Sequence, residues 1–412
     1  MRLNRTRGVQ LIISRESAEL GMNRHECTKL DESPARYGHH ECRMIPAAAR
    51  FMHHRIMRTG NRHLTTMTEK GANMQSSHWN IKPGGNPVRY PGAITDVPGI
   101  VVGHAHDNEA HTGCTVIVAE QGAVCGVDVR GSAPGTRETE LLQPTALVQH
   151  IHALCLSGGS AFGLAASQGV MQRLQEQGIG LDVGVAKVPI VPSAILFDLA
   201  IGNPTVVPTA EMGYSAVENA MSEAVAEGNV GAGAGATLGK FAGVERAMKG
   251  GFGTASVQLP NGLVIGAAVA VNAVGEVRHP KHGITLAGAR ADEKGQFIDP
   301  LSFLTQLANP FQATMKPGTN TTIAAVACNG TFTKTEMTKI AQMAHNGLAR
   351  TIYPVHTMYD GDTVFAMTTG GIDASVDLAG MWAAEVLAYA VHNAIIAANS
   401  VEGVPCSQEW LD

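Results

Sequence analysis

Cysteines and aromatic residues are scarce in this 412-residue chain. The seven cysteines are scattered without a Cys-x-x-Cys pair, and such an odd, dispersed set argues against a disulfide framework. We therefore expect free thiols in a reducing compartment and a cytoplasmic protein. Aromatic residues make up only 5% of the chain, whereas glycine accounts for 47 residues, so helices, strands and backbone are expected to approach one another closely.

Long apolar runs are also missing. No charge-free run of about 18 or more apolar residues occurs, so the sequence predicts no transmembrane helix and no membrane partner. The richest segment, Leu378 to Ala398, contains Glu385, His392 and Asn393, and we interpret it as a helix buried in the protein. With 44% hydrophobic and 16% charged residues, the chain is typical of a globular protein that buries a substantial core.

The first 88 residues differ in composition from the rest. Residues 1–80 carry 13 Lys or Arg against 7 Asp or Glu, hold 7 of the 17 histidines, and show no sustained hydrophobic period. A basic segment could contact nucleic acid or anionic lipid, but we expect neither partner here. We interpret residues 1–88 as a disordered extension or a mis-assigned start upstream of Met67 or Met74. The folded domain is predicted to be 89–412.

From residue 90 onward, short apolar runs bounded by glycine alternate with helical patterns. The strands are largely apolar instead of alternating, which favours sheets covered on both faces. We predict an α/β (α+β) fold in layers, with helices on the outside. We predict strands at 99–106, 113–120, 122–129 and 362–370, a further strand from Thr321, and a hairpin over 257–277. We predict helices at 214–226 and 378–398, one after the glycine turn in 154–178, and one that starts at the capping box Thr333-x-x-Glu336.

Two patterns suggest a cofactor or metal, and neither has the context that such a site needs. "GAGAGATLG" (231–239) fits a dinucleotide loop formally, but no buried strand precedes it and no acidic residue follows at the required distance. We interpret its glycines as allowing close backbone approach around a compact site. His104, His106 and His111 could chelate a divalent ion, yet no further ligands occur at a recognisable spacing. We expect no cofactor and no metal.

A third pattern is the junction in "KPGTNTTIAAVACNG" (316–330), where a polar run ends at Asn320 and a strand pattern begins at Thr321. The simple interpretation is a strand that starts there. The other is self-cleavage, in which the Thr321 hydroxyl attacks the Asn320 carbonyl and water hydrolyses the resulting ester. The new N-terminal amine could then serve as the base that a threonine nucleophile requires. The residues alone leave both interpretations open.

Six blocks of the sequence stand out in a fixed order: "DVRGSAPGTRETELL" (128–142), "LSGGSAFGL" (156–164), "GAGAGATLGK" (231–240), "VNAVGEV" (271–277), "NTTIAAVA" (320–327) and "PVHTMYDGDTVFAMTTG" (354–370). Together they resemble the DmpA-type aminopeptidases, the family that includes β-peptidyl aminopeptidases and nylon-oligomer hydrolases. The resemblance extends from about Tyr90 to Ala398. It implies a four-layer αββα sandwich with a topology shared with ornithine acetyltransferase, and self-cleavage before a Ser or Thr.

The resemblance implies a role for five side chains. Thr321 becomes the nucleophile of both self-processing and turnover, so that cleavage at Asn320-Thr321 gives an α chain to 320 and a β chain 321–412. Lys240 supplies a cation, and Asn272, a polar residue in an apolar strand, is suited to donate to an oxyanion. Asp360 and Asp362 are expected to orient Lys240 and the Thr321 amine, or to shift each other's pKa.

A glycine turn completes the expected site. Gly159 and Ser160 lie in a segment, 158–163, that is expected to present backbone N–H groups at a helix start to an oxyanion or a substrate end. Phe162 stands where the best-known relatives have Tyr, so a phenol donor is missing and the ring is expected to shape an apolar pocket.

We expect a self-processing aminopeptidase that acts on small peptides or amides through an acyl-enzyme on Thr321, and a homo-oligomer of αβ units. The alternatives are an endo-hydrolase of ω-amino acid oligomers, an enzyme resembling N-acetyltransferases, and a non-catalytic homologue that binds small peptides.

Overall fold

The computed structural model describes residues 88–307, 318–401 and 403–412. The predicted extension, residues 1–88, therefore lies outside the described residues apart from Val88, as do Cys27 and Cys42. The five cysteines that are described are free and buried, which agrees with the prediction for this part of the chain: Cys114, Cys125, Cys155, Cys328 and Cys406.

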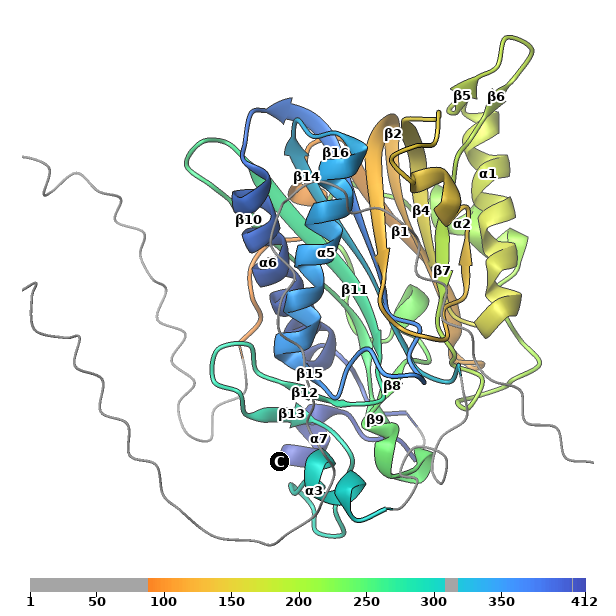
Figure 1. The fold of residues 1–412 in the computed structure, drawn as a ribbon. Helices are drawn as coiled ribbons and strands as arrows, with labels where there is room; N and C mark the ends of the chain where they lie inside the picture. Colours follow the sequence, from red (N-terminus) through yellow and green to blue (C-terminus); the bar gives the residue numbers. More distant parts are fainter. Residues whose placement is uncertain (1–87, 308–317, 402) are drawn as a thin grey trace, which may run out of the picture. The chain divides into compact units, whose positions relative to one another are not determined.

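Nine strands form the central sheet (Figure 1): β1 (Ile100–Asp107), β2 (Thr112–Val129), β3 (Thr136–Arg137), β4 (His150–Ser157), β7 (Ser193–Ile195), β10 (Gly251–Gln258), β11 (Val264–Asn272), β14 (Thr321–Gly330) and β16 (Thr363–Ile372). Hydrogen bonds connect them in the order β10-β11-β14-β16-β2-β4-β7-β3, and β1 pairs with β2 beside this path. Neighbours are antiparallel except for two parallel pairs, β14 with β16 and β4 with β7.

Two helix pairs cover the sheet on opposite sides (Figure 1): α1 (Ala166–Glu176) with α2 (Ala210–Glu218), and α5 (Lys334–Thr351) with α6 (Val376–Ile396). None of the helices described combines the length and the apolar character that crossing a membrane requires. Smaller elements complete this part of the chain: β5 (Leu181–Asp182), β6 (Lys187–Val188), β8 (Thr237–Leu238), β9 (Met248–Lys249), β12 (Glu276–Arg278), β13 (Thr285–Ala287), α3 (Pro300–Thr305), β15 (Ile352–Tyr353) and α7 (Ser407–Leu411).

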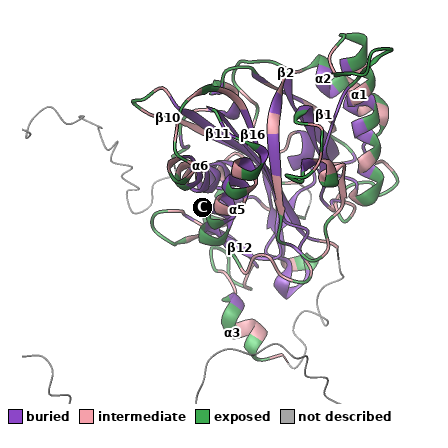
Figure 2. Ribbon diagram, turned by 45° about the horizontal axis from the view of Figure 1, so that its top comes forward, coloured by how far each residue is buried: buried purple, intermediate pink, exposed green. Residues whose placement is uncertain are grey.

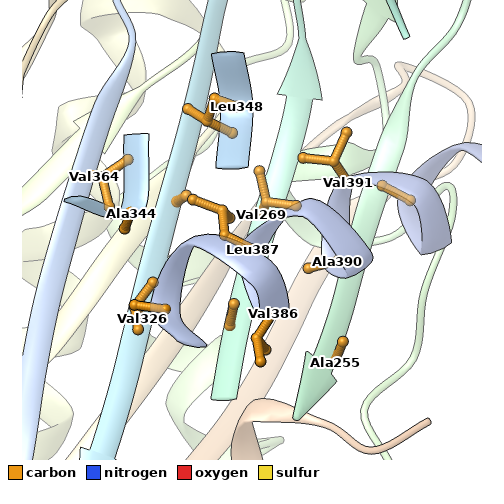
Figure 3. Packing of buried hydrophobic residues seen from close by; sticks show 14 of the residues in the cluster. Ala255, Val269, Val326, Ala344, Leu348, Val364, Val386, Leu387, Ala390 and Val391 are labelled. Carbon is orange, nitrogen blue, oxygen red and sulfur yellow. The ribbon is translucent and has the colours of Figure 1, made fainter. Parts of the chain in front are cut away.

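Three hydrophobic clusters show that the elements form four layers. One lies between α5/α6 and strands β10, β11, β14 and β16, where Leu348 and Leu387 pack towards Val269 and Val326 (Figure 3). The second lies between the two halves of the sheet, and the third lies between α1/α2 and strands β1, β2 and β4. Buried strands are accordingly enclosed by helices with exposed outer faces (Figure 2). The order is helix, sheet, sheet, helix, as the αββα prediction requires.

Strand β14 shows why the apolar strand pattern predicted covered sheets. All ten of its residues are buried. Ala324 and Val326 belong to the cluster under α5/α6, whereas Ile323, Ala325 and Ala327 belong to the cluster between the sheet layers. Because successive side chains of a strand point to opposite faces, each face needs its own apolar set, and alternation with polar residues disappears.

Several predicted boundaries change in the structure. The predicted strands 113–120 and 122–129 are one strand, β2, which bends at Gly122 (φ 81°) and belongs to both sheet layers. The helix predicted at 214–226 is α2, which begins after the N-cap Thr209, four residues earlier than predicted, and ends at Glu218, eight residues earlier than predicted. The predicted hairpin, capping box and buried long helix are confirmed, as β10-β11, the start of α5, and α6.

Candidate active site

The predicted cleavage junction lies at one end of the central strands of the sheet, where three separate segments meet. Asn320 and Thr321 are 0% and 2% exposed, at the start of β14. Thr321 pairs with Asn272, the last residue of β11, and Asn320 forms a parallel bridge with Asp360, just before β16. Because β14 lies between β11 and β16, its first residue receives neighbours from both sides.

Two donors converge on the carbonyl oxygen of Asn320. The Thr321 hydroxyl donates to it at 2.5 Å, and the Gly361 backbone N–H donates to it at 2.9 Å. The nucleophile candidate thus lies against the carbonyl that it would attack, and a backbone donor already polarises that carbonyl. Gly361 was missed in the sequence because a backbone N–H carries no side-chain signal; its position between Asp360 and Asp362 was the only pointer.

We expect a Gly361→Ala substitution to slow cleavage of the 320–321 bond by about 10²-fold, since small misplacements of reacting groups have effects of this size. A Cβ at this position would lie 2.7 Å from the Thr321 hydroxyl oxygen and 2.7 Å from the Ala133 carbonyl oxygen, so one of them must shift. Cleavage followed on denaturing gels measures the effect. Gly178→Ala is the control for backbone strain alone, because the new Cβ would meet no atom within 4 Å although the residue has a φ of 71°; equal rates in both variants would contradict the prediction.

Lys240 is buried beside the junction, at 4% exposure. Its Nζ donates to the Asn272 side-chain oxygen (2.9 Å), to the Asn272 backbone oxygen (3.2 Å) and to the Thr319 carbonyl (3.1 Å). Burial lowers the pKa of Lys240 to about 7, although the carboxylates of Asp360 and Asp198 act in the opposite direction. The three acceptors match the three N–H donors of the ammonium form and therefore favour it.

Asn272 connects Lys240 to the backbone before the junction. Its Oδ1 accepts from Lys240 and from the Thr237 N–H at 3.0 Å. Its Nδ2 donates to the carbonyls of Phe197 (2.9 Å) and Thr319 (3.5 Å). In the intact chain the amide therefore contacts the carbonyl of residue 319, one residue before the junction, and the backbone donor on the Asn320 carbonyl is Gly361.

The two aspartates have different partners. Asp360 Oδ2 accepts from Thr357, from its N–H at 2.9 Å and its hydroxyl at 2.6 Å. Burial, together with the neighbouring Asp362, raises the pKa of Asp360 to about 6. Asp362 accepts from the Thr322 N–H at 2.7 Å and from both the backbone N–H (3.1 Å) and Nδ1 (2.8 Å) of His356. Asp362 thus anchors the residue after Thr321 in the intact chain, and His356, absent from our sequence-based site, is its partner.

The glycine turn differs from the prediction. The N–H groups of Gly158, Gly159 and Ser160 already donate to Gly113 O (2.8 Å), to Asp198 Oδ1 (2.7 Å) and to Leu196 O (2.9 Å). The expectation that they are available to an oxyanion or a substrate is therefore wrong. The sequence shows the turn, where Gly159 and Ser160 have φ values of 75° and 54°, but it does not show which acceptors fold back onto it. The Phe162 ring is 68% exposed.

A cavity of about 500 Å³ opens beside Lys240 and Thr319. In the intact chain it lies on the N-terminal side of the junction, because Thr319 lines it. Three carboxylates and several apolar side chains share its wall, so it suits a ligand with a cationic group and an apolar part. Phe162 does not line it. The carboxylates are Glu109, Asp198 and Glu245; the larger apolar side chains are Phe197, Ile201, Val244, Val401 and Val404.

The glycine-rich block 231–239 and the histidines near residue 104, to which we assigned no cofactor and no metal from the sequence, make other contacts in the structure. Gly231 and Gly233 pack closely: a Cβ would lie 2.2 Å from the Thr115 hydroxyl at the first and 2.3 Å from the Phe252 N at the second, which agrees with close backbone approach. His104 bonds the Thr115 hydroxyl at 2.9 Å, and burial lowers its pKa to about 4. Within the described ranges, no group of three or more His, Cys, Asp or Glu could hold a metal ion.

The four-layer fold is that of aminopeptidases of the Ntn hydrolase class. The L-aminopeptidase D-Ala-esterase/amidase from Ochrobactrum anthropi, described as a variant of the Ntn hydrolase fold, matches with a TM-score of 0.57 at 21% identity. That match covers 77% of this chain and 91% of the other. The β-aminopeptidase of Burkholderia sp. matches with a TM-score of 0.55 at 23% identity, over 76% of this chain and 90% of the other.

The chain belongs to peptidase family S58, whose model matches residues 92–408. An uncharacterized aminopeptidase of Mycobacterium bovis is 43% identical over 77% of this chain and 98% of its own length. A 6-aminohexanoate-oligomer endohydrolase of Kocuria sp. is 33% identical over 70% of this chain and 78% of its own length. The resemblance seen in the six sequence blocks is thereby confirmed, and the chain is a hydrolase of the aminopeptidase and amidase kind.

Proposed function

We propose that this protein cleaves its own Asn320-Thr321 bond and then uses Thr321 as the nucleophile of an aminopeptidase. One observation carries the proposal: the Thr321 hydroxyl lies 2.5 Å from the carbonyl oxygen of the preceding residue, in a buried site where Gly361 donates to the same oxygen. A chain that merely begins a strand at Thr321 has no need of a buried cation, a buried amide and two buried carboxylates around that residue.

The processing reaction starts with attack of Thr321 Oγ on the carbonyl carbon of Asn320. Negative charge develops on the carbonyl oxygen, where the Gly361 N–H donates. The hydroxyl proton is transferred to the Thr321 nitrogen as the C–N bond breaks, which leaves an ester between Asn320 and Thr321 Oγ and a free amine on residue 321. Water hydrolyses the ester to a carboxylate at 320 and a free threonine at 321.

Turnover uses groups that processing sets free. The new α-amine of Thr321 has an ordinary pKa of about 7.7–8.0, so a useful fraction is neutral near pH 7 and can take the hydroxyl proton. Departure of Thr319 releases the Lys240 ammonium and the Asn272 amide, which both donate to its carbonyl in the intact chain. These donors are then available to a substrate carbonyl. Thr321 Oγ attacks that carbonyl, the substrate C–N bond breaks, and the amine leaves with the proton that the α-amine took from the hydroxyl. Water then hydrolyses the acyl-Thr321 ester.

The cavity beside Lys240 supports aminopeptidase action. It lies on the side of the junction where the acyl part of a substrate must bind, and three of its wall residues, Glu109, Asp198 and Glu245, are carboxylic acids. A free N-terminal ammonium is complementary to such a wall. The relative from Mycobacterium bovis, 43% identical, is named an aminopeptidase, which agrees with this choice.

Endo-hydrolysis of ω-amino acid oligomers is the second candidate. The apolar wall of the cavity, with Phe197, Ile201 and Val244, suits a methylene chain between an amide and a distant amine. The relative from Kocuria sp. is named a 6-aminohexanoate-oligomer endohydrolase.

Intact mass spectrometry of the purified wild-type protein, followed by assays on short amides with free and acetylated N-termini, tests the proposal. We expect a break between 320 and 321 and release of residues only from free N-termini. Cleavage of acetylated 6-aminohexanoate oligomers would favour the second candidate. Transfer of the acyl group to an added amine would indicate a transferase, and an unbroken, inactive chain that binds peptides would indicate a non-catalytic homologue. An unbroken chain with full activity would contradict the mechanism.

We expect processing to be fastest between about pH 6 and about pH 7. Its rate should rise as Asp360 loses its proton near pH 6, because the carboxylate is then a counter-ion for Lys240. It should fall as Lys240 loses its proton near pH 7, since the ammonium donates to Asn272 and Thr319. Precursor from cell-free synthesis, transferred into buffers of different pH, gives the profile on gels. A rate that still climbs above pH 8 would instead make neutral Lys240 a base.

A further inference from the structure

Two glycine-rich blocks of the sequence meet at a single carboxylate, Asp198, which is 3% exposed. Its Oδ1 accepts the N–H of Gly159 at 2.7 Å, and its Oδ2 accepts the Thr112 hydroxyl at 2.7 Å. A Cβ at Gly158 would lie 2.0 Å from Oδ2, and a Cβ at Gly235 would lie 2.7 Å from the Asp198 Cβ. The glycines of both blocks therefore make room for this carboxylate.

Two buried lysines, Lys240 and Lys249, lie within electrostatic range of Asp198. Lys249 is 0% exposed, and its Nζ donates to the carbonyls of Gly233 (2.9 Å), Ala236 (3.0 Å) and Gly250 (3.1 Å), which fixes the loop that leads to Lys240. Burial lowers the pKa of each lysine to about 7, and Asp198 acts against burial in both cases. Burial likewise raises the pKa of the Asp198 carboxyl, against the hydrogen bonds from Thr112 and Gly159.

Other charged groups surround this cluster and must be considered with it. Asp360 faces Lys240 from the segment before β16 and supports the ammonium form more strongly than Asp198 does. Glu109, His111 and Glu245 line the same cavity as Asp198 and Lys240. Of the three carboxylic acids in the wall, Asp198 is the buried one.

The residue before Asp198 contacts the site as well. The carbonyl of Phe197 accepts the Asn272 amide at 2.9 Å, while Oδ1 of that amide group accepts from Lys240 at 2.9 Å. The segment 197–198 thus reaches the Lys240–Asn272 pair in two ways, by charge through Asp198 and by a backbone hydrogen bond through Phe197.

We propose that Asp198 is a positioning residue of this hydrolase, the buried counter-ion that helps to keep Lys240 charged and holds the Phe197 carbonyl on Asn272. The assignment rests on the proposed function, in which the Lys240 ammonium takes part in processing and turnover. Asp198 acts through Lys240 and Asn272, and it does not touch the Asn320 carbonyl.

Asp198→Asn tests the charge with little change in shape. The asparagine oxygen can still accept from Gly159, and the Thr112 hydroxyl can rotate to accept from the new amide. In cell-free precursor, the alkaline limb of the processing profile should move to lower pH by about one unit, because an opposite charge has been removed from a lysine. Asp182→Asn is the control; Asp182 is exposed, accepts the Gly184 N–H at 2.8 Å, and should leave the profile unchanged.

Asp198→Ala with added formate gives a second test that does not depend on the asparagine variant. Formate can return a carboxylate to the space beside the cavity, and we expect it to restore the alkaline limb towards the wild-type position. An unshifted limb in Asp198→Asn, or a defect in Asp198→Ala that formate leaves unchanged, would overturn the counter-ion role. If folded wild-type precursor is not cleaved at any pH, the proposed function has failed instead.

Discussion

Replacing Thr321 by alanine is expected to leave the chain unbroken, whereas the wild-type protein separates into residues 1–320 and 321–412. The variant lacks the hydroxyl that lies against the Asn320 carbonyl as a nucleophile, and it retains the Gly361 donor and the buried surroundings. Without a hydroxyl there is no ester intermediate and no acyl-enzyme, so both processing and turnover should fall below detection. Intact mass spectrometry reads the first outcome and release of an amine from a small amide reads the second.

The neighbouring threonine provides a matched control. Thr322 is also buried, but it follows Thr321 on a strand and therefore points to the opposite face, and its N–H is held by Asp362. Thr322→Val should be cleaved between 320 and 321 as in the wild type, and Thr321→Ser, which keeps a hydroxyl, should also be cleaved. Cleavage at this bond in Thr321→Ala would contradict the mechanism, because another group would then have to attack.

Replacing Lys240 by methionine is expected to slow turnover by about 10²- to 10³-fold, the range seen when one preorganised donor to developing charge is removed. Processing should also slow, because the Thr319 carbonyl beside the junction loses a donor that positions it. Methionine fills a similar apolar volume, so the variant removes mainly the ammonium, which donates to Asn272 and Thr319 in the intact chain. Time courses of cleavage in cell-free precursor measure the processing rate, and assays on processed protein measure the turnover rate.

A second buried lysine serves as the control for Lys240. Lys334 is 4% exposed and, like Lys240, donates to three oxygens, the carbonyls of Leu141, Ala146 and Val148. These acceptors belong to the loop before β4 instead of the junction, so Lys334→Met should lower the free energy of unfolding and leave the cleavage rate of folded precursor unchanged. Equal slowing in both variants would show that loss of a buried lysine alone explains the effect.

The sequence was sufficient for the layered architecture because the central strands are apolar on both faces. In β14, small residues such as Ala324, Ala325 and Ala327 leave no solvent-facing stripe, which requires cover on both sides. The sequence could not predict that β2 is one continuous strand, because a glycine at 122 is compatible with a turn between two strands and with a bend inside one. The φ of 81° at Gly122 and the pairing of β2 with strands of both layers depend on tertiary structure.

The site was predictable where a side chain carries the chemistry and a motif marks its position. Lys240, Asn272, Thr321 and Asp360 come from four separate segments, and the family resemblance, not any period or spacing, indicated that they meet. Gly361 escaped prediction because its contribution is a backbone N–H.

Hydrogen-bond partners supplied by distant residues were also beyond the sequence. We predicted that the turn at Gly159 and Ser160 offers free backbone N–H groups, but oxygens of residues 113, 196 and 198 accept hydrogen bonds from the turn. His356 lies in a loop with other polar residues, and Asp198 is a single polar residue after an apolar strand; both patterns also occur in ordinary loops. Only the folded chain shows that His356 is bonded to Asp362, next to the junction, and that Asp198 lines the cavity beside it.

The position of residue 321 in the strand order decides what a broken chain would look like. Residues 321–412 supply β14 and β16, which lie in the middle of the sheet between β11 and β2, and both helices of the α5/α6 pair. A cut here would therefore leave two polypeptides whose strands are interleaved and whose interface is the protein's own hydrophobic interior. Such a pair behaves as an obligate complex: it should copurify through any native column and come apart only when the whole molecule unfolds.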